Sequence, residues 1–332
     1  MKGIRILSVY EAPHARTKEK IMKIAMMYAG QGTQKAGMGK DMYEKFDTYR
    51  ATIDSLDLDF DLKEVMFEDK SNLLDKTEYT QPCMSAHFAA VTNVLKENYI
   101  FPEAALGLSL GEFGAFYSAG IYDANTYVKL LEYRGKVMME ATGEKAFAMK
   151  AVLGMSSDEI NRHLENVSEY GYVKIANYNC PGQYVICGDK AACEKAAETL
   201  LENGAKKIVD VKVSGPFHTK YMEVAGEKLR SYLETINLKK PEHKLVLNLT
   251  GEYLADDTDI KENMKLQLQN SVLLEKSLIK LLEDDFDTFI EIGPGKALSG
   301  FLKRTAKALG RDVKILSIET AADVDNLLKN QI

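Results

Sequence analysis

The segment Gly107-Leu108-Ser109-Leu110-Gly111 places a serine between two glycines, directly after an apolar run. This spacing is typical of a nucleophile elbow, a sharp strand-to-helix turn that exposes a serine hydroxyl at the edge of a sheet. The same pattern also arises by chance as an ordinary glycine-flanked turn. Because an apolar strand precedes it and a helical segment follows it, we interpret Ser109 as a candidate nucleophile.

A serine hydroxyl attacks a carbonyl carbon only when a base lies within hydrogen-bond reach. Of the five histidines, His218 alone follows an apolar strand and a turn, at the start of a long predicted helix. That position can hold an imidazole over a cleft, although a plain polar helix start is the competing interpretation. Surface or core positions suit the other histidines better, namely His14, His87, His163 and His243.

A glycine-containing loop, Gly30-Gln31-Gly32-Thr33-Gln34, follows the first predicted strand. Its backbone N–H groups could stabilise the negative charge that develops on oxygen when a serine attacks a carbonyl group. A phosphate-binding loop and a plain turn are the competing interpretations. The Gly-Lys-Ser or Gly-Lys-Thr of a P-loop is missing, which disfavours the first of them.

The elements that must position these residues follow an α/β pattern, in which short apolar runs alternate with longer segments of helical period. This pattern indicates a largely parallel sheet covered by helices. The expected strands of that sheet are residues 23–28, 104–108, 245–249, 286–291 and 313–318. The clearest helices are expected at residues 83–96, 124–141, 219–235 and 271–282.

One interval departs from this rhythm and predicts a separate small domain. Strands at 147–153, 172–177, 184–187 and 206–213 and helices at 157–165 and 190–202 give the order βαββαβ, which is typical of a ferredoxin-like module. We therefore expect a small domain at 146–212, inserted between the two parts, 23–145 and 213–332, of a larger catalytic domain. Residues 1–22 are interpreted as an N-terminal extension. The cleft between the domains is the expected substrate site.

The composition excludes several classes of protein. The chain has 332 residues, 45% of them hydrophobic, and 43 Lys and Arg against 49 Asp and Glu give a net charge of −6, which disfavours nucleic acid as a partner. The four cysteines form no metal-binding pattern, so we expect reduced thiols and no metal. No apolar segment reaches the length of a membrane span or resembles a signal peptide, so we expect a cytoplasmic protein without membrane contact.

Several short motifs follow one another along the chain, at residues 30–34, 81–82, 107–112, 133–135, 179–188, 215–218 and 291–296. In sequence and in order they resemble the motifs of the malonyl-CoA:acyl carrier protein transacylases of fatty acid synthesis. The resemblance covers about residues 24 to 320. It implies a large α/β-hydrolase-like domain with a parallel sheet, and a small inserted ferredoxin-like domain.

The resemblance also implies the catalytic roles. Ser109 would be the nucleophile and His218 the base that takes its proton and returns it to the leaving thiol. The backbone N–H groups of Gln31 and Leu110 would form the oxyanion hole. A backbone carbonyl, which best matches Gln267, would orient the histidine in place of a carboxylate.

Substrate recognition follows from the same resemblance. Arg134 corresponds to the arginine that grips the free carboxylate of a malonyl group, a task that suits the two parallel donors of a guanidinium. Taken alone, an arginine in Leu131-Glu132-Tyr133-Arg134 is usually part of a solvated helix face. The resemblance assigns the acyl pocket to Phe217, Met138, Asn179 and Gln183, and the bulk of Phe217 would exclude a branched acyl group.

The implied activity is transfer of malonyl from malonyl-CoA to the phosphopantetheine thiol of acyl carrier protein, by a ping-pong mechanism without metal or cofactor. A stand-alone acyltransferase of a polyketide synthase is the first alternative, and a serine hydrolase or thioesterase is the second. A binding module without activity is disfavoured by the presence of Ser109, His218 and Arg134. We expect a monomer that docks the acidic carrier through basic residues, for which the candidates are Lys206, Lys207, Lys212, Lys220, Lys303 and Arg304.

Two positions depart from the family pattern. Leu108 stands where the family commonly has a histidine, so the hydrogen bond of that histidine is expected to be missing. Cys187 stands where the family often has serine, and this exchange is expected to be tolerated.

Overall fold

A five-stranded parallel sheet forms the centre of the molecule. The computed structural model describes residues 23–143, 145–211 and 215–329, so the predicted extension 1–22 and the predicted boundary at 212–213 lie outside the described residues. The strand order is β7-β2-β1-β8-β9, with every neighbouring pair parallel. The strands are β1 (Ile24–Tyr28), β2 (Ala104–Gly107), β7 (Lys244–Leu245), β8 (Thr288–Ile292) and β9 (Lys314–Ile318).

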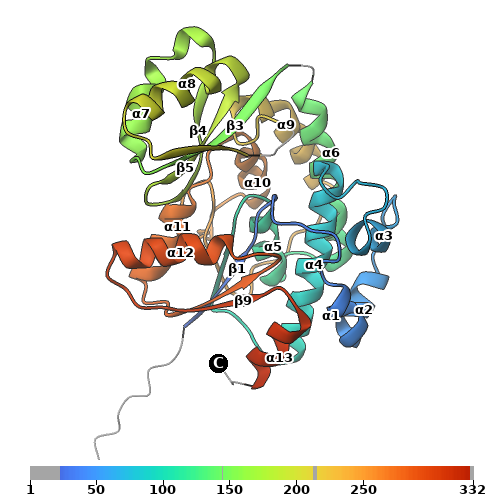
Figure 1. The fold of residues 1–332 in the computed structure, drawn as a ribbon. Helices are drawn as coiled ribbons and strands as arrows, with labels where there is room; N and C mark the ends of the chain where they lie inside the picture. Colours follow the sequence, from blue (N-terminus) through green and yellow to red (C-terminus); the bar gives the residue numbers. More distant parts are fainter. Residues whose placement is uncertain (1–22, 144, 212–214, 330–332) are drawn as a thin grey trace, which may run out of the picture.

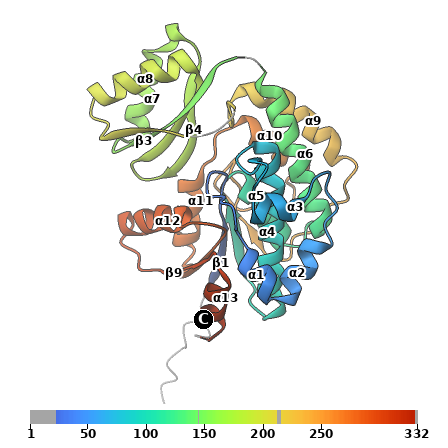
Figure 2. The ribbon, with the colours of Figure 1, turned by 45° about the vertical axis from the view of Figure 1, so that its right-hand side comes forward.

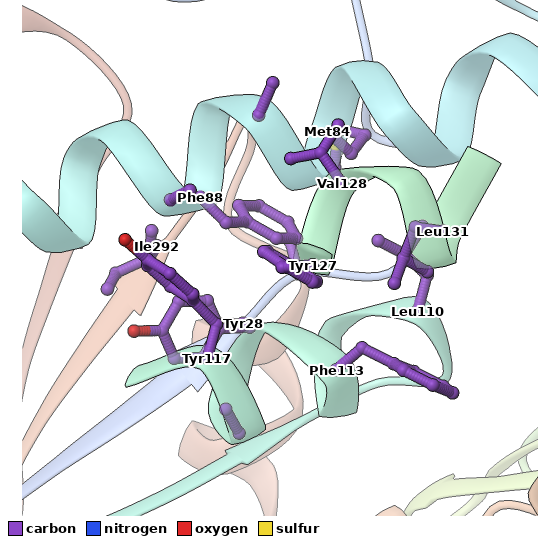
Figure 3. Packing of buried hydrophobic residues seen from close by; sticks show 14 of the residues in the cluster. Tyr28, Met84, Phe88, Leu110, Phe113, Tyr117, Tyr127, Val128, Leu131 and Ile292 are labelled. Atoms are coloured by element: carbon purple, nitrogen blue, oxygen red, sulfur yellow. The ribbon is translucent and has the colours of Figure 1, made fainter. Parts of the chain in front are cut away.

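Helices cover both faces of this sheet, which explains why its strands are apolar runs without alternation. Met26 and Tyr28 of β1 belong to the core under α4, α5 and α6, whereas Ala25 and Met27 point into a second core under α11 and α12. Figure 3 shows Tyr28, Phe88 and Tyr127 meeting in the first core. The helices of this part are α1 (Lys40–Lys45), α2 (Asp47–Asp54), α3 (Leu62–Phe67), α4 (Thr77–Glu97), α5 (Leu110–Ser118), α6 (Ala124–Thr142), α9 (Glu223–Leu233), α10 (Ile260–Gln269), α11 (Leu274–Glu283), α12 (Ala297–Ala308) and α13 (Ala321–Lys329).

A second, antiparallel sheet stands apart from the first in both views (Figures 1 and 2). Its strand order is β4-β5-β3-β6, its helices α7 and α8 lie on the side away from the parallel sheet, and it has a hydrophobic core of its own. Along the chain the main elements are β3 (Phe147–Leu153), α7 (Ser157–Glu165), β4 (Val173–Cys180), β5 (Gln183–Asp189), α8 (Lys190–Glu202) and β6 (Lys207–Asp210). The predicted α/β class and the predicted order of these elements are confirmed.

Some predicted elements were wrong in extent. The helix expected to begin at residue 83 begins at Thr77. Pro82 therefore lies inside the helix and does not mark its first turn, where proline is most common. The helix expected from residue 219 is divided into a 3₁₀ turn, Lys220–Met222, and α9. The strand expected at 245–249 ends at Leu245. Val246 still donates to the carbonyl of Ala105 in β2 at 3.0 Å, and it also forms an isolated bridge with Tyr253.

In the part of the chain that the structure describes, no helix combines the length and the apolar composition needed to cross a membrane.

Candidate active site

The elbow at Ser109 joins the end of β2 to the start of α5. Ser109 has φ 54° and ψ −103°, a backbone conformation that non-glycine residues rarely adopt. The glycines on either side are required by space: a Cβ on Gly107 would collide with the backbone of Gly111, and a Cβ on Gly111 would collide with the carbonyl of Tyr28. The sequence thus forms a tight, strained turn in which the serine is presented at the carboxyl end of the central strands.

His218 contacts the serine from the segment that precedes the 3₁₀ turn Lys220–Met222. Its Nε2 lies 2.8 Å from Ser109 Oγ, and its Nδ1 lies 2.9 Å from the carbonyl oxygen of Gln267. A carbonyl oxygen only accepts hydrogen bonds, so Nδ1 carries a proton and donates a hydrogen bond to the carbonyl oxygen of Gln267. Nε2 is therefore the lone-pair nitrogen that accepts the Ser109 hydroxyl, which is the tautomer that a general base requires.

Burial keeps this histidine neutral. The pKa of His218 is lowered from 6.5 to about 4. The larger cause is burial, which disfavours the charged imidazolium, and the second is the nearby positive charge of Arg134. The hydrogen bond to Gln267 acts in the opposite direction and does not offset them. The imidazole is thus available as a base at neutral pH, and a proton that it receives from Ser109 is readily passed on.

We expect an NMR titration of the imidazole resonances to place the pKa of His218 well below the value in the urea-unfolded chain. A lowered folded-state pKa means that the unfolded chain binds the proton first. The contribution of His218 to the free energy of unfolding is therefore fully present above pH 6.5. It is lost as the pH falls from 6.5 toward 4, by roughly 3 kcal/mol in total. Spectra of His218→Asn assign the resonance, and a titration midpoint near 6.5 in the folded protein would contradict the burial argument.

Arg134 lies on α6 with its guanidinium beside the nucleophile. The side chain is 0% exposed, so the solvated helix face that its local sequence favours is wrong: α4 and α6 pack closely here. Nη1 donates to Gln81 Oε1 at 2.8 Å, while Nη2 donates to Gln267 Oε1 at 3.0 Å and to Ser109 Oγ at 3.3 Å. Burial lowers the pKa of Arg134 to about 9, which leaves the group charged at neutral pH.

A cavity of about 290 Å³ opens over the serine, between the two sheets. Residues of β3 and β5, such as Met149 and Val185, form one wall, and residues of the parallel-sheet part form the other. The structure brings most of the predicted site residues to this cavity, namely Gln31, Ser109, Met138, Asn179, Gln183, Phe217 and His218. Leu110, Arg134 and Gln267 are buried behind the lining.

The predicted oxyanion donors lie on either side of the elbow. Leu110 is the first residue of α5, where a helix leaves its N–H groups without an internal acceptor. The Gln31 loop approaches from the end of β1, with Gly30 against Leu108 so closely that a Cβ there would lie 2.9 Å from the leucine side chain. Gln31 Nε2 donates to Thr77 Oγ1 at 2.9 Å, which holds the side chain against the start of α4.

The four residues predicted to form an acyl pocket differ in their hydrogen bonding. Met138 Sδ accepts a hydrogen bond from Gln81 Nε2 at 3.5 Å, and Gln183 Oε1 accepts one from Arg304 Nη1 at 2.7 Å. Phe217 is buried and packs at the cavity wall. The Oδ1 atom of Asn179 is buried and has no hydrogen-bond partner among the described residues, so it is available to a bound molecule.

Sequence reasoning missed Asn248 and its link to Glu112. Glu112, in the first turn of α5, is fully buried and accepts a hydrogen bond from the backbone N–H of Asn248 at 2.6 Å. The Asn248 side chain in turn accepts a hydrogen bond from Ser109 N at 2.8 Å. The available signal was a polar residue in the apolar run Leu245-Val246-Leu247-Asn248-Leu249, because a buried amide must have hydrogen-bond partners.

Comparison with known proteins places this chain in a family. The model of the acyl transferase domain matches residues 26–331. The chain belongs to this acyl transferase family. Its relatives include malonyl CoA-acyl carrier protein transacylases of Bacillus subtilis, 38% identical over 86% of this chain and 92% of the relative, and of Staphylococcus aureus, 36% identical over 93% and 99%.

Solved structures of the acyl transferase family have the same fold. The malonyl CoA-acyl carrier protein transacylase of Clostridium perfringens is 37% identical and superposes with a TM-score of 0.88, over 93% of this chain and 97% of that one. The enzyme from Streptococcus pneumoniae is 35% identical, with a TM-score of 0.86 over 93% and 100% of the two chains. A malonyl-transacylase in complex with a type II polyketide synthase acyl-carrier protein is 31% identical, with a TM-score of 0.88 over 93% and 99%.

Proposed function

We propose that this chain transfers the malonyl group of malonyl-CoA to acyl carrier protein for fatty acid synthesis. The observation that carries the proposal is that Ser109 Oγ lies 2.8 Å from His218 Nε2 and 3.3 Å from Arg134 Nη2. A hydroxyl, an imidazole and a guanidinium this close together could act as nucleophile, base and carboxylate receptor. The names of the relatives, all malonyl transacylases, support the same activity.

The first half-reaction loads the serine. Ser109 Oγ attacks the thioester carbonyl carbon while His218 Nε2 takes the hydroxyl proton. The carbonyl oxygen becomes an oxyanion on the N–H groups of Leu110 and Gln31. The oxyanion collapses, the carbon–sulfur bond breaks, and the coenzyme A thiolate takes the proton from His218, so that malonyl-Ser109 and the coenzyme A thiol result.

The second half-reaction runs in reverse order with a different thiol. The phosphopantetheine thiol of the carrier gives its proton to His218 and attacks the ester carbonyl carbon. The bond from that carbon to Ser109 Oγ breaks, and His218 returns the proton to the serine. The products are malonyl-carrier and free enzyme, and no metal or redox cofactor takes part in any step, so we propose that none is needed.

Selectivity for malonyl follows from charge. A free carboxylate can accept two hydrogen bonds from Arg134, and an acetyl group offers nothing to this buried cation. Phe217 fills the wall on the side of His218, which leaves little room for a methyl branch.

A polyketide carrier is the second candidate partner, because a relative of similar identity binds a type II polyketide synthase carrier protein. The chemistry would be unchanged. A serine hydrolase fits less well, since the orienting partner of His218 is the carbonyl of Gln267 and not a carboxylate.

We also propose that the parallel-sheet part is an α/β-hydrolase-like domain and that residues 146–212 are an inserted ferredoxin-like domain. The strand order β4-β5-β3-β6 with helices on one side supports the second assignment. The protein is proposed to act as a cytoplasmic monomer. Exposed basic residues that could meet the acidic carrier are Lys206, Lys207, Lys220, Lys303 and Arg304, whereas Lys212 lies outside the described residues.

The test is malonyl transfer to purified phosphopantetheinylated acyl carrier protein, followed by the intact mass of the carrier. With malonyl-CoA and the protein, we expect the carrier to gain one malonyl group rapidly, and with acetyl-CoA to gain little. A fatty acid carrier and a polyketide carrier are compared at equal concentration to choose between the two partners. If neither carrier gains mass while malonyl-CoA is hydrolysed, the protein is a hydrolase and the proposal is wrong.

A further inference from the structure

The backbone of the strained nucleophile is held from both sides by amide side chains that lie far away in the sequence. Asn248 Oδ1 accepts the hydrogen bond of Ser109 N at 2.8 Å, and Gln267 Nε2 donates to the carbonyl oxygen of Ser109 at 2.8 Å. Asn248 Nδ2 also donates to the carbonyl of Gly107 at 2.7 Å. A non-glycine residue at φ 54° persists only when its surroundings over-determine it, so these bonds are what the strained turn requires.

Both amide-bearing residues converge on one buried carboxylate. Glu112 Oε1 accepts from the backbone N–H of Asn248 at 2.6 Å, and Oε2 accepts from Gln267 Nε2 at 2.7 Å. The Glu112 side chain is 0% exposed and lies one turn of α5 beyond Ser109. A single carboxylate therefore joins the two supports of the nucleophile.

The carboxylate decides which way the Gln267 amide faces. The two ends of a glutamine amide are nearly equal in size, but an ionised carboxylate only accepts hydrogen bonds, so Nε2 must point to Glu112. With Nε2 on that side, Gln267 Oε1 is the end that meets Arg134 Nη2, at 3.0 Å. A reversed amide would place an oxygen against the Ser109 carbonyl and donors against the guanidinium.

The bond from Gln267 to the Ser109 carbonyl also acts on the oxyanion hole. The carbonyl of Ser109 and the N–H of Leu110 belong to one rigid peptide plane. This carbonyl accepts hydrogen bonds from Gln267 Nε2 at 2.8 Å and from the backbone N–H of Glu112 at 3.1 Å, which together fix the direction of the Leu110 N–H and polarise it toward a negative charge. The Gln267 side chain thus adds to the orientation that α5 itself gives to the proposed oxyanion donor.

We propose that Glu112 is a positioning residue, which acts through Gln267 and Asn248 to hold Ser109 and the oxyanion N–H of Leu110 in their reactive geometry. This inference rests on the proposed function.

The charge of Glu112 is compatible with this role. Its charged or titratable neighbours are Arg134 on α6 and Tyr122 after α5. Burial raises the pKa of Glu112 to about 7, while the bonds from Asn248 and Gln267 and the charge of Arg134 lower it. Above that pH the carboxylate is ionised and accepts at both oxygens.

The experiment compares Glu112→Gln with wild type at about pH 8, by rapid quench and intact mass, with malonyl-CoA and acetyl-CoA as separate acyl donors. We expect the acylation rate constant of the variant to fall roughly 10- to 100-fold with both donors, because misaligning an oxyanion donor costs less than the 10²- to 10³-fold of removing one. The malonyl-to-acetyl ratio stays within about threefold of wild type, because the oxyanion is common to both reactions.

A matched control is Glu291→Gln. Glu291 is also 0% exposed and also accepts two hydrogen bonds, from Leu298 N at 2.9 Å and Ser299 N at 2.8 Å, but it does not line the cavity. We expect this variant to lose stability while its acylation rate constant stays within about threefold of wild type. Thermal unfolding of both variants separates folding from positioning. If Glu112→Gln does not fold, Asn248→Ala tests the other support of Ser109 and should show the same equal loss with both donors.

Two outcomes would overturn the proposal. One is a folded Glu112→Gln protein that acylates at the wild-type rate. The other is a loss confined to malonyl-CoA, which would mean that Glu112 acts only through the charge of Arg134. Wild type is measured in the same series. If the proposed function is wrong, wild type itself forms no acyl adduct, and this result is distinct from a failure of the role proposed for Glu112.

Discussion

Replacing Ser109 with alanine is expected to abolish the covalent malonyl adduct and to reduce transfer to the carrier by at least about 10³-fold. Ser109 lines the cavity, and its Oγ is hydrogen-bonded to His218 Nε2 at 2.8 Å, so its removal takes away the hydroxyl that the base would activate. The measurement is the intact mass of the protein after brief exposure to malonyl-CoA. Wild type should gain one malonyl group, and Ser109→Ala should gain none.

The matched control is Ser118→Ala. Ser118 Oγ also lies near a histidine, 3.1 Å from His243 Nε2, but it is buried at the end of α5 and does not line the cavity. This variant should form the adduct as wild type does. An adduct that persisted in folded Ser109→Ala would show that another residue is the nucleophile, and peptide mapping would locate it.

Replacing Arg134 with alanine is expected to lower acylation by malonyl-CoA roughly 10²- to 10³-fold while acylation by acetyl-CoA falls much less. Removing one partner of a buried, hydrogen-bonded charge pair costs about 2–5 kcal/mol, and only the malonyl carboxylate forms such a pair. The measurement is kcat/KM for each donor, obtained from coenzyme A release with the carrier present.

The control on the same helix is Lys136→Ala, whose side chain is 44% exposed and pairs with the exposed Asp59 and with the largely buried Glu132. It should change neither rate appreciably, since Lys136 does not line the cavity. Equal losses with malonyl-CoA and acetyl-CoA in Arg134→Ala would contradict the assignment. Such a result would mean that the arginine serves mainly as the counter-charge of Glu112 in the core.

Local patterns determined much of the fold. The predicted bounds of β3, α7 and α8 agree with the structure residue for residue, because each is delimited by nearby signals. Ser156 and Glu159 form a capping box at the start of α7, for example, and this interaction spans only four residues. Predictions were poorer at Pro82, which lies inside α4 and does not mark its start, and at residues 245–249, where the strand ends early and Val246 forms an isolated bridge with Tyr253.

The sequence by itself also indicated the chemistry of Ser109, since an elbow is a local feature of strand, glycine and helix. It could not decide the surroundings of the side chains. Whether Arg134 faced water or the core depended on which face of α6 meets α4, and periodicity alone does not choose between faces. The bonds of Ser109 to Asn248 and Gln267 join residues separated by 139 and 158 positions. Only the closed tertiary structure brings such groups together, because their pairing depends on the packing of whole elements. The polar Asn248 within an apolar run indicates a buried amide, but it does not indicate which group that amide meets.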